Sequence, residues 1–407
     1  MSGAEGKHVT LIGCGASSAT LTAEASEALH DAHLVIGAKR LLSALSLRAE
    51  QETEALTASD EILNRIRSAG DKRICVVFSG DTGFYSGASG LVSLLNDAHI
   101  PYRICPGISS VQMLAARIAV PWQDWRLCSA HGVACDPAGE MTHGKPVLFL
   151  TGNTQTPATL CRELTDAGLG DLRAVVGEDL GLEQERITDT TVRACADLRF
   201  SALSVLWVEA APVPEADSYG LGDERFIRSD VPMTKAVVRA AVVSALRAAP
   251  GDCIWDIGAG TGSVSVALSR AVRHGSVYAV EYRDAALNLI AQNRKKLCAW
   301  NLRVVAGKAP EALKTLPVPD AVFIGGSGGS MKAILDIVFS KNADARVCVS
   351  AIALETLHAA CEALEGYGLK ADVTQIAVSR TKEAGTLHMM AANNPVFLVT
   401  AGKGCDT

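Results

Sequence analysis

The sequence predicts an α/β fold in two domains, and three observations support this prediction. Short apolar runs alternate along the chain with segments whose apolar residues recur every three or four positions, which is typical of βα units. Glycine-rich loops directly follow several of the apolar runs. A stretch rich in glycine and proline, residues 211–222, separates two such series of units.

The composition is typical of a folded protein in a reducing compartment of the cell. The chain has 407 residues, of which 48% are hydrophobic and 20% charged, and its formal net charge is −6, which excludes a disordered chain. The 12 cysteines show no CxxC pair and no Cys/His spacing of a metal cage, so we expect reduced thiols and no metal. The apolar runs are strand-sized and no signal peptide is apparent, so we expect a cytoplasmic protein that does not span a membrane.

The first half predicts a largely parallel sheet followed by a second block. The expected strands are residues 8–12, 34–37, 73–79 and 102–105, and the expected helices are residues 21–30, 58–69, 87–95 and 111–118. After an irregular stretch, strands are expected at residues 147–150, 173–176 and 202–208, with a helix at residues 157–167.

The second half starts a new βα series after the linker. We expect helices at residues 235–246, 263–271 and 285–297, and strands at residues 253–257, 277–281, 303–305, 321–324, 345–351, 372–378 and 396–400. The predicted domains are residues 1–211 and 223–407, joined by a linker at residues 212–222. Residues 1–215 carry a net charge of −9 and residues 216–407 one of +3, which is far from the basic footprint of a nucleic-acid-binding protein.

One motif of the second half indicates an adenosine-type ligand. A strand ends in Gly258-Ala259-Gly260-Thr261-Gly262, where glycines allow close backbone approach and a following helix offers free N–H groups. Glu281 closes the next strand, 23 positions after Gly258, where a carboxylate accepts both hydroxyls of a ribose. The pattern alone leaves nicotinamide dinucleotides and S-adenosylmethionine both open.

Three loops of the first half also follow strands, at the edge where open α/β sheets bind ligands. The first contains Gly13 and Gly15, and the second, SGDTGFYSG, contains Gly80 and Asp81. The third places the hydroxyls of Ser109 and Ser110 at the start of a helix. Asp81 is either a cofactor-loop residue or a turn cap.

These residues carry a resemblance that covers nearly the whole chain. The first half resembles the class III tetrapyrrole methyltransferases through LIGCG, SGDTGFYSG, CPGISSVQMLAARIAVPWQDW and the segment SAHG. The second half resembles class I S-adenosylmethionine-dependent methyltransferases, more narrowly their corrin-pathway branch, through VPMTK, WDIGAGTGSV, AVEY, VVAGKAPEAL and PDAVFIGG.

The resemblance implies a fold and a reaction. We expect an N-terminal tetrapyrrole-methylase fold of two α/β subdomains and a C-terminal Rossmann-like class I methyltransferase fold, each with one S-adenosylmethionine site. The implied reaction methylates carbons 5 and 15 of a reduced tetrapyrrole and removes the ring C acetate carboxyl. The N-terminal half is expected to act at carbon 5, and the C-terminal half at carbon 15 and in decarboxylation. Relatives of the first half commonly dimerise, so a homo-oligomer is expected.

Further site residues follow from the resemblance. Thr234 is expected to close over the cofactor, or equally to cap the next helix, and Ala309 to lie near the adenine. Gly325 and Gly326 are expected beside the substrate. Arg228 and Arg239 are candidates for gripping its carboxylates, although a solvated helix surface is the commoner role of such residues.

Two histidines are candidate acid–base residues because histidine titrates near neutrality. These are His131 in the segment SAHG and His388 in GTLHMM, and a structural role is an equal alternative for each. Met389 and Met390 are expected in the core.

Two rival functions remain open from the sequence. One is a nicotinamide-dependent oxidoreductase, because GAGTG followed by an acid fits it. The other is a class I RNA methyltransferase with a binding module, which the acidic first half disfavours.

Overall fold

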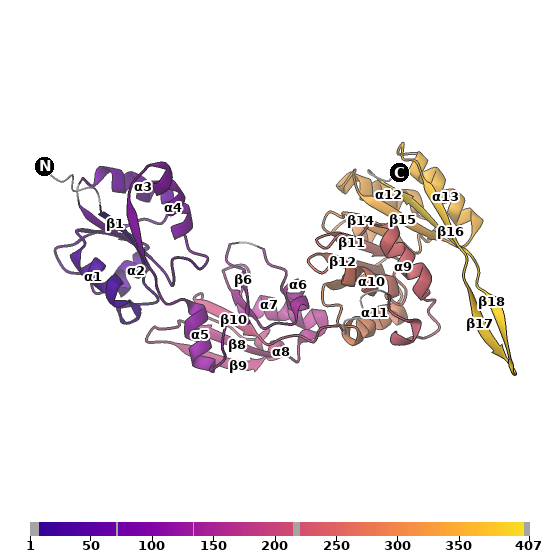
Figure 1. The fold of residues 1–407 in the computed structure, drawn as a ribbon, viewed down its shortest axis with the longest axis horizontal. Coiled ribbons are helices and arrows are strands. Elements are labelled where there is room, and N and C mark those ends of the chain that lie inside the picture. The colour runs from indigo at the N-terminus through magenta and orange to yellow at the C-terminus, as the bar shows by residue number, and fades with distance from the viewer. Residues whose placement is uncertain (1–7, 71, 133, 215–219, 403–407) are drawn as a thin grey trace. The chain divides into compact units, whose positions relative to one another are not determined.

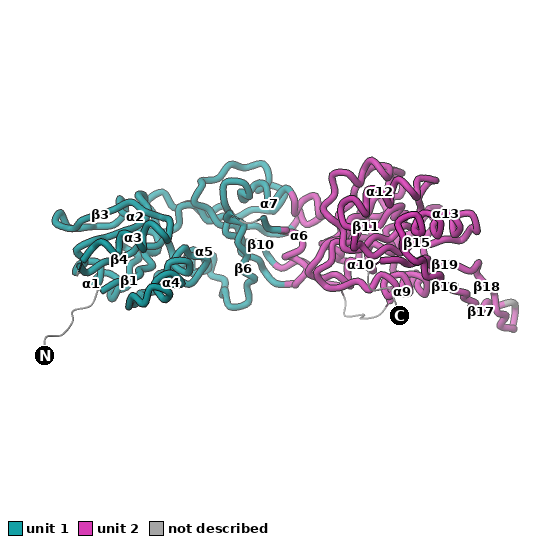
Figure 2. Tube along the Cα trace, turned by 90° about the horizontal axis from the view of Figure 1, so that it is seen from above, with its two compact units in different colours: residues 1–135, 145–162, 172–209 teal, residues 136–144, 163–171, 210–407 magenta. Residues whose placement is uncertain are grey.

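The computed structural model describes residues 8–70, 72–132, 134–214 and 220–402, so residues 215–219 of the predicted linker lie outside the described residues. The chain divides into two compact units, which Figure 2 colours separately. Unit 1 holds residues 1–135, 145–162 and 172–209, and unit 2 holds residues 136–144, 163–171 and 210–407. Two short segments of the predicted first domain therefore group with the second unit.

The first sheet of unit 1 is parallel and has the strand order β3-β2-β4-β1-β5. Its strands are β1 (His8–Gly13), β2 (Leu34–Gly37), β3 (Glu52–Ala55), β4 (Arg73–Phe78) and β5 (Tyr102–Cys105). Helices α1 (Ala23–Asp31), α2 (Lys39–Ala44), α3 (Ser59–Ser68) and α4 (Ala88–Asp97) pack around it. Leu11 and Ile12 belong to separate apolar clusters because neighbouring strand residues point to opposite faces. Both faces of the sheet are thus covered.

The second sheet of unit 1 corrects the expectation of a largely parallel first half. Its order is β6-β7-β10-β8-β9, and only the β6–β7 pair is parallel. The strands are β6 (Arg126–Ser129), β7 (Val147–Leu150), β8 (Arg173–Glu178), β9 (Arg186–Thr191) and β10 (Ser204–Val208). The helices of this part of the chain are α5 (Ser110–Ile118), α6 (Pro137–Glu140), α7 (Pro157–Leu164) and α8 (Val192–Cys195). Helix α5 lies on this sheet, where Leu114 packs in one cluster with Val175 and Trp207 (Figure 1).

Unit 2 contains a seven-stranded sheet of order β13-β12-β11-β14-β15-β19-β16. The strands are β11 (Cys253–Ile257), β12 (Ser276–Glu281), β13 (Leu302–Ala306), β14 (Ala321–Ile324), β15 (Arg346–Ala351), β16 (Asp372–Ile376) and β19 (Val396–Ala401). The five strands β11–β15 are parallel, and β19 pairs antiparallel with β15 and β16. The helices are α9 (Ala236–Ala245), α10 (Ser263–Ala271), α11 (Asp284–Lys296), α12 (Met331–Lys341) and α13 (Leu354–Glu365). The strand order reverses between β11 and β14, which is where such sheets bind ligands.

A two-stranded ribbon leaves this sheet between β16 and β19 (Figure 1). It consists of β17 (Ser379–Ala384) and β18 (Leu387–Ala392). Met389 and Met390 are 59% and 66% exposed, so the expectation that they pack in the core is wrong. The physical reason is that the ribbon pairs only with itself, which leaves both of its faces without a packing layer.

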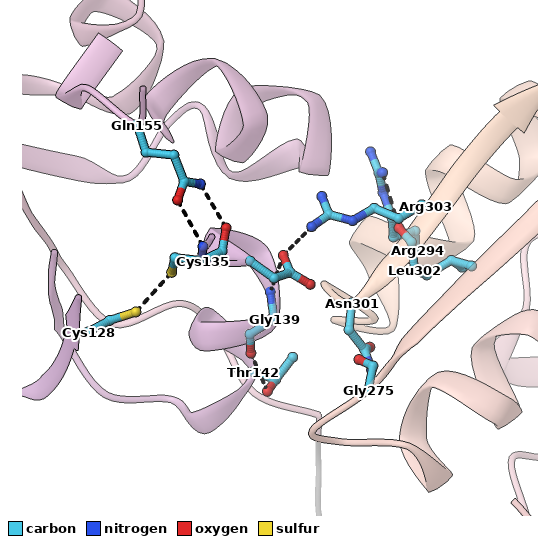
Figure 3. A network of polar contacts seen from close by, with 11 residues as sticks. Cys128, Cys135, Gly139, Thr142, Gln155, Gly275, Arg294, Asn301, Leu302 and Arg303 are labelled. Carbon is cyan, nitrogen blue, oxygen red and sulfur yellow. Dashed lines mark hydrogen bonds and ion pairs between the residues drawn. The ribbon is translucent and has the colours of Figure 1, made fainter. Parts of the chain in front are cut away.

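The two early segments of unit 2 are held by polar contacts to β13 and to the end of α11. Arg303 forms an ion pair with Asp136, and Arg294 Nη2 donates to the carbonyl of Asp166 at 2.6 Å. Figure 3 shows both arginines beside the segment that carries Gly139 and Thr142. Burial lowers the pKa of Arg294, with the neighbouring Arg303 acting in the same direction. Deletion of residues 163–171 would therefore take from the buried Arg294 one of its hydrogen-bond acceptors, and deletion of residues 136–144 would remove the ion-pair partner of the partly exposed Arg303.

Residues 8–70, 72–132, 134–214 and 220–402 contain neither a membrane-spanning helix nor a cluster of metal ligands. No helix within these ranges is long and apolar enough to cross a membrane. No group of three or more His, Cys, Asp and Glu side chains in the described part of the chain could hold a metal ion.

Candidate functional site

A pocket with a volume of about 910 Å³ lies in unit 2, at the carboxyl ends of β11, β12, β14 and β15. Its lining includes most of the C-terminal residues predicted from the sequence. These are Thr234, Gly258, Ala259, Gly260, Thr261, Glu281, Ala309, Gly325 and Gly326. The structure thus brings residues from five separate loops to one cavity.

The glycine loop after β11 owes its composition to its backbone conformation. Gly258, Gly260 and Gly262 have φ angles of 72°, 58° and 74°, a region that side chains with a Cβ rarely adopt. A Cβ on Gly258 would stand 2.8 Å from the backbone N of Gly326, so this glycine also lets the β14 loop approach. Gly262 does not line the pocket; a Cβ there would meet Ile290 of α11.

Glu281 ends β12 with a buried, ionised carboxylate. Its side chain is 3% exposed, and Oε2 accepts a hydrogen bond from Gly260 N at 3.0 Å while Oε1 accepts from Tyr282 N at 2.9 Å. Burial opposes ionisation, but hydrogen bonds from the backbone and side chain of Arg283, and from Tyr282 and Gly260, hold the pKa of Glu281 below its usual value. The carboxylate is therefore charged, fixed in orientation and placed on the pocket wall.

Two buried polar atoms on the same wall have no hydrogen-bond partner among the described residues. They are Oδ1 of Asp256 and Oγ1 of Thr261. The other oxygen of Asp256 accepts from Ser265 Oγ, and burial raises the pKa of this carboxyl to about 7. Buried polar atoms are nearly always paired, so these two are exceptions, and both belong to residues that line the pocket. Asp256 was not among the predicted site residues, although it stands only two positions before Gly258.

Besides Gly262, three residues predicted for this domain lie outside the pocket lining. Arg239 is 1% exposed, donates to the carbonyls of Leu221 and Thr234, and lies 4.6 Å from the ring centroid of Phe226. It holds the segment before α9 together and is neither a solvated surface residue nor available to a substrate. Arg228 Nε donates to the carbonyl of Asp223 at 3.0 Å.

His388 is the third. It stands opposite Glu383 in the β17–β18 pairing, near the tip of the exposed ribbon, and its Nε2 lies 4.0 Å from Oε1 of Glu383. Only the ribbon's stem reaches the pocket. The ribbon thus carries His388 away from the described cavity, which gives no support to an acid–base role for it.

Thr234 lines the pocket but does not cap a helix. Helix α9 begins at Ala236 with Lys235 at the N-cap position and no side-chain cap bond. The helix-cap alternative is therefore wrong, and the backbone carbonyl of Thr234 instead accepts from Arg239 Nη1 at 2.7 Å.

A smaller cleft of about 270 Å³ lies between the two sheets of unit 1. It is lined by the predicted residues Gly15, Gly80, Asp81, Ser109, Ser110 and His131. Gly13 lies behind the lining, where a Cβ would stand 2.6 Å from the backbone N of Gly107. Gly15 and Gly80 exchange backbone hydrogen bonds of 3.0 and 2.8 Å, which join the first two loops.

Asp81 and Ser109 have defined structural roles within this cleft. The Asp81 carboxylate accepts from Gly83 N at 2.8 Å and from Gly107 N at 3.1 Å, so it ties two loops together. Ser109 is the N-cap of α5 and forms a capping box with Gln112. His131 Nδ1 lies 3.1 Å from the carbonyl oxygen of Thr151, which orients its ring at the cleft. Burial raises the pKa of the nearby Cys14 thiol to about 12, so this loop cysteine is not reactive.

Sequence reasoning missed several lining residues of the cleft. Arg40 Nη2 donates to Ser79 Oγ at 3.2 Å, and Tyr85 lines the wall with its hydroxyl donating to the carbonyl of Leu127 at 3.1 Å. Tyr85 has a positive φ of 45°, and its place in SGDTGFYSG was the available signal. Arg40 lies in α2, which the periodicity did not predict, so no local signal identified it.

Comparison with known proteins assigns each half of the chain to a methyltransferase family. A family model described as tetrapyrrole (corrin/porphyrin) methylases matches residues 8–196, and one described as a precorrin methyltransferase domain matches residues 225–403. A precorrin-6Y C(5,15)-methyltransferase [decarboxylating] of Sinorhizobium sp. is 32% identical over 341 residues, which is 82% of each chain.

Two further relatives match a smaller share of the chain. A probable cobalt-precorrin-6B C(15)-methyltransferase (decarboxylating) of Pyrobaculum calidifontis is 43% identical over 185 residues, or 45% of this chain and 95% of the relative. A crystal structure of precorrin-6y C5,15-methyltransferase from Geobacter metallireducens GS-15 is 38% identical and covers 46% of this chain and 98% of that one, with a TM-score of 0.44.

Proposed function

Because the chain belongs to the family of decarboxylating precorrin-6Y C(5,15)-methyltransferases, we propose that it methylates carbons 5 and 15 of a reduced tetrapyrrole and removes the ring C acetate carboxyl in cobalamin biosynthesis. Unit 1 acts at carbon 5, and unit 2 acts at carbon 15 and in decarboxylation. The observation that carries the proposal is the presence of two pockets built on two different methyltransferase families in one chain.

Each pocket binds one S-adenosylmethionine in this proposal. In unit 2, Glu281 accepts the ribose hydroxyls, Ala309 borders the adenine, and Asp256 and Thr261 line the same pocket. In unit 1, the backbone of Gly80 and the hydroxyl of Ser110 border the cofactor, while Asp81 holds the loop in shape. When bound, S-adenosylmethionine supplies an electrophilic methyl group on a sulfonium.

The protein's share of the reaction is positioning. The electron-rich macrocycle carbon is itself the nucleophile, so no covalent intermediate is needed. Holding donor and acceptor in line at about 3 Å contributes roughly 7–11 kcal/mol to lowering the barrier. Gly326 borders open space that the macrocycle can use, because a Cβ there would meet no atom within 4 Å, whereas a Cβ on Gly325 would stand 3.1 Å from Phe323 Cε1. His131, at the cleft of unit 1, is the remaining acid–base candidate.

The test is the mass of the pigment after incubation with S-adenosylmethionine and the reduced tetrapyrrole under anaerobic conditions. We expect a gain of two methyl groups and a loss of one carbon dioxide. Cobalt-free and cobalt-containing substrates are both offered, because the relatives' names include both. An unchanged mass with cofactor bound contradicts the proposed reaction. Protection against heat by NADH but not by S-adenosylhomocysteine would instead favour the oxidoreductase, and salt-dependent binding of RNA the RNA methyltransferase.

A further inference from the structure

The pocket of unit 2 has a charged side and an uncharged side. Its charged lining residues are Lys235, Asp256, Glu281, Arg283 and Lys308, which precede α9 or follow β11, β12 and β13. Every lining residue from Phe323 onward is uncharged, and these residues follow β14 and β15 or flank β16 and β19. The strand order β13-β12-β11-β14-β15-β19-β16 places Asp256, Glu281, Arg283 and Lys308 on one side of the point where the order reverses, and the uncharged residues on the other. Lys235 is the exception, because it precedes α9, which packs against β19 through Val242 and Leu398.

The uncharged side has an apolar wall with a few neutral polar groups. Ile352, in the turn between β15 and α13, is 64% exposed, and Val378 and Val396 lie at the stem of the ribbon. A hydrogen bond of 2.9 Å from Asn393 N to the carbonyl of Val378 closes this stem. Asn393 and Asn394 both line the pocket. Exposed apolar side chains beside carboxamides suit a flat macrocycle with a carboxylate on its rim.

Loss of carbon dioxide from the acetate and methyl transfer balance each other in charge. The bond between the acetate methylene and the carboxyl carbon breaks, and its electron pair enters the conjugated macrocycle. The methyl group transferred from the sulfonium brings one positive charge to the same macrocycle, so methyl transfer and carbon dioxide loss together need no net proton, oxidant or external base. A later proton shift within the macrocycle leaves this balance unchanged.

A cation beside the carboxylate would oppose this step. Its attraction is strongest for the localised charge of the starting carboxylate and weaker once the charge has spread into the ring, so it stabilises the ground state more than the transition state. An apolar wall that displaces water has the reverse effect. Carboxamide N–H groups can still orient the carboxylate, because each amide donates two hydrogen bonds without a full charge.

We infer that the uncharged side of the unit 2 pocket receives the acetate that leaves as carbon dioxide, and that Asn393 and Asn394 orient it for that loss. This inference rests on the proposed function and assigns its second chemical step to residues outside the cofactor-binding side. The two asparagines are positioning residues.

The decisive variant places a cation in this wall. Ile352→Lys is compared with Ile352→Met in the full chain, since both replace the branched side chain with an unbranched one and only one is charged. Leu354→Lys adds the same charge outside the pocket lining, at a residue that is 68% exposed, and is expected to behave as the unchanged protein. Release of carbon dioxide and the mass of the product are measured, and binding of S-adenosylhomocysteine is followed by calorimetry.

We expect Ile352→Lys to release carbon dioxide at least about tenfold more slowly than Ile352→Met, the size of one added charged contact, with unchanged binding of S-adenosylhomocysteine. Equal rates for the two variants overturn the inference. An unchanged protein that neither methylates nor decarboxylates overturns the proposed function itself, which separates the two failures.

A second pair of variants tests orientation by the amides. Asn394→Leu removes the donors with little change in size, and Asn394→Gln restores them on a longer arm. We expect Asn394→Leu to lower the ratio of carbon dioxide released to methyl transferred, and Asn394→Gln to recover part of it. An unaltered ratio in Asn394→Leu contradicts the role of this amide, whatever happens to the total rate.

Discussion

An acidic residue lines the pocket of each unit, and the two carboxylates have different hydrogen-bond roles. In unit 2, Glu281 is buried, ionised and fixed by backbone N–H groups, so that its carboxylate forms part of the pocket wall. In unit 1, the carboxylate of Asp81 accepts hydrogen bonds from Gly83 N and Gly107 N and thereby joins two loops. The carboxylate of Glu281 lines a pocket, whereas that of Asp81 holds two pocket loops in shape. An acidic residue in a glycine-rich loop after a strand therefore does not by itself indicate a ligand contact.

Replacing Glu281 should have the largest effect. Glu281→Ala removes an ionised acceptor from the cofactor-binding side, and hydrogen bonds to charged groups are worth roughly 1.5–3 kcal/mol each. We expect S-adenosylhomocysteine to bind unit 2 at least about a hundredfold more weakly, so that calorimetry detects one site where the unchanged chain has two. Asp284→Asn, in the first turn of α11 and outside the pocket lining, is the control. Two undiminished sites in Glu281→Ala would contradict the assigned role.

Asp256 makes the pocket of unit 2 sensitive to pH. Burial raises the pKa of its carboxyl from 3.8 to about 7, so the folded state favours the protonated form. The resulting stability is fully present below pH 4 and is lost as the pH rises through 7, by up to roughly 4 kcal/mol.

Chemical unfolding of the unchanged chain and of Asp256→Asn, measured from pH 4 to 8, tests this expectation. The stability of the unchanged chain relative to the variant should fall as the pH rises. A parallel pH dependence of the two proteins, or a rise, would show that Asp256 is ionised in the folded state throughout.

Replacing Asp81 should have a smaller effect than replacing Glu281. Asp81→Ala leaves two backbone N–H groups without their acceptor, at a cost of about 1–3 kcal/mol, and loosens the cleft of unit 1. We expect methylation at carbon 5 to fall by about tenfold with methylation at carbon 15 retained. The product mass and its methyl positions are read by mass spectrometry and NMR. Loss of both methylations together would instead indicate that the two units do not act independently.

Replacing either histidine should have the smallest effects of all, and His131 and His388 should differ in them. His131→Ala removes a ring that lines the cleft of unit 1, and we expect methylation at carbon 5 to fall severalfold. His388→Ala changes an exposed side chain near the tip of the ribbon, and we expect no loss of activity and a stability change within about 0.5 kcal/mol. Initial rates and thermal unfolding of both variants are the measurements. A larger loss of activity in His388→Ala than in His131→Ala reverses the assignment.

Local patterns predicted much of the fold but not all of it. Strands such as β1, β4 and β11 were predicted within a residue or so, because a run of apolar residues buried on both faces is a strong signal. The periodicity did not predict β3, which is polar and lies at a sheet edge. It also did not predict the ribbon β17–β18, because an exposed ribbon needs no alternation of apolar and polar residues. The antiparallel pairing of the second sheet of unit 1 was also missed, because strand direction depends on contacts distant in sequence.

The homo-oligomer expected from the sequence remains a prediction. Size-exclusion chromatography with light scattering on the full chain would test it.

By itself the sequence determined the two methyltransferase halves, the glycine loop from Gly258 to Gly262, and the acid at Glu281, because each depends on the order of residues within one βα unit. Only the tertiary structure decided which charged side chains face a pocket. It buried Arg239 against Phe226, carried His388 out on a ribbon, and left the wall around Asn393 and Asn394 without charge. The physical reason is that a side chain's partners come from whichever elements the sheet order brings beside it, and that order is not written in any one segment.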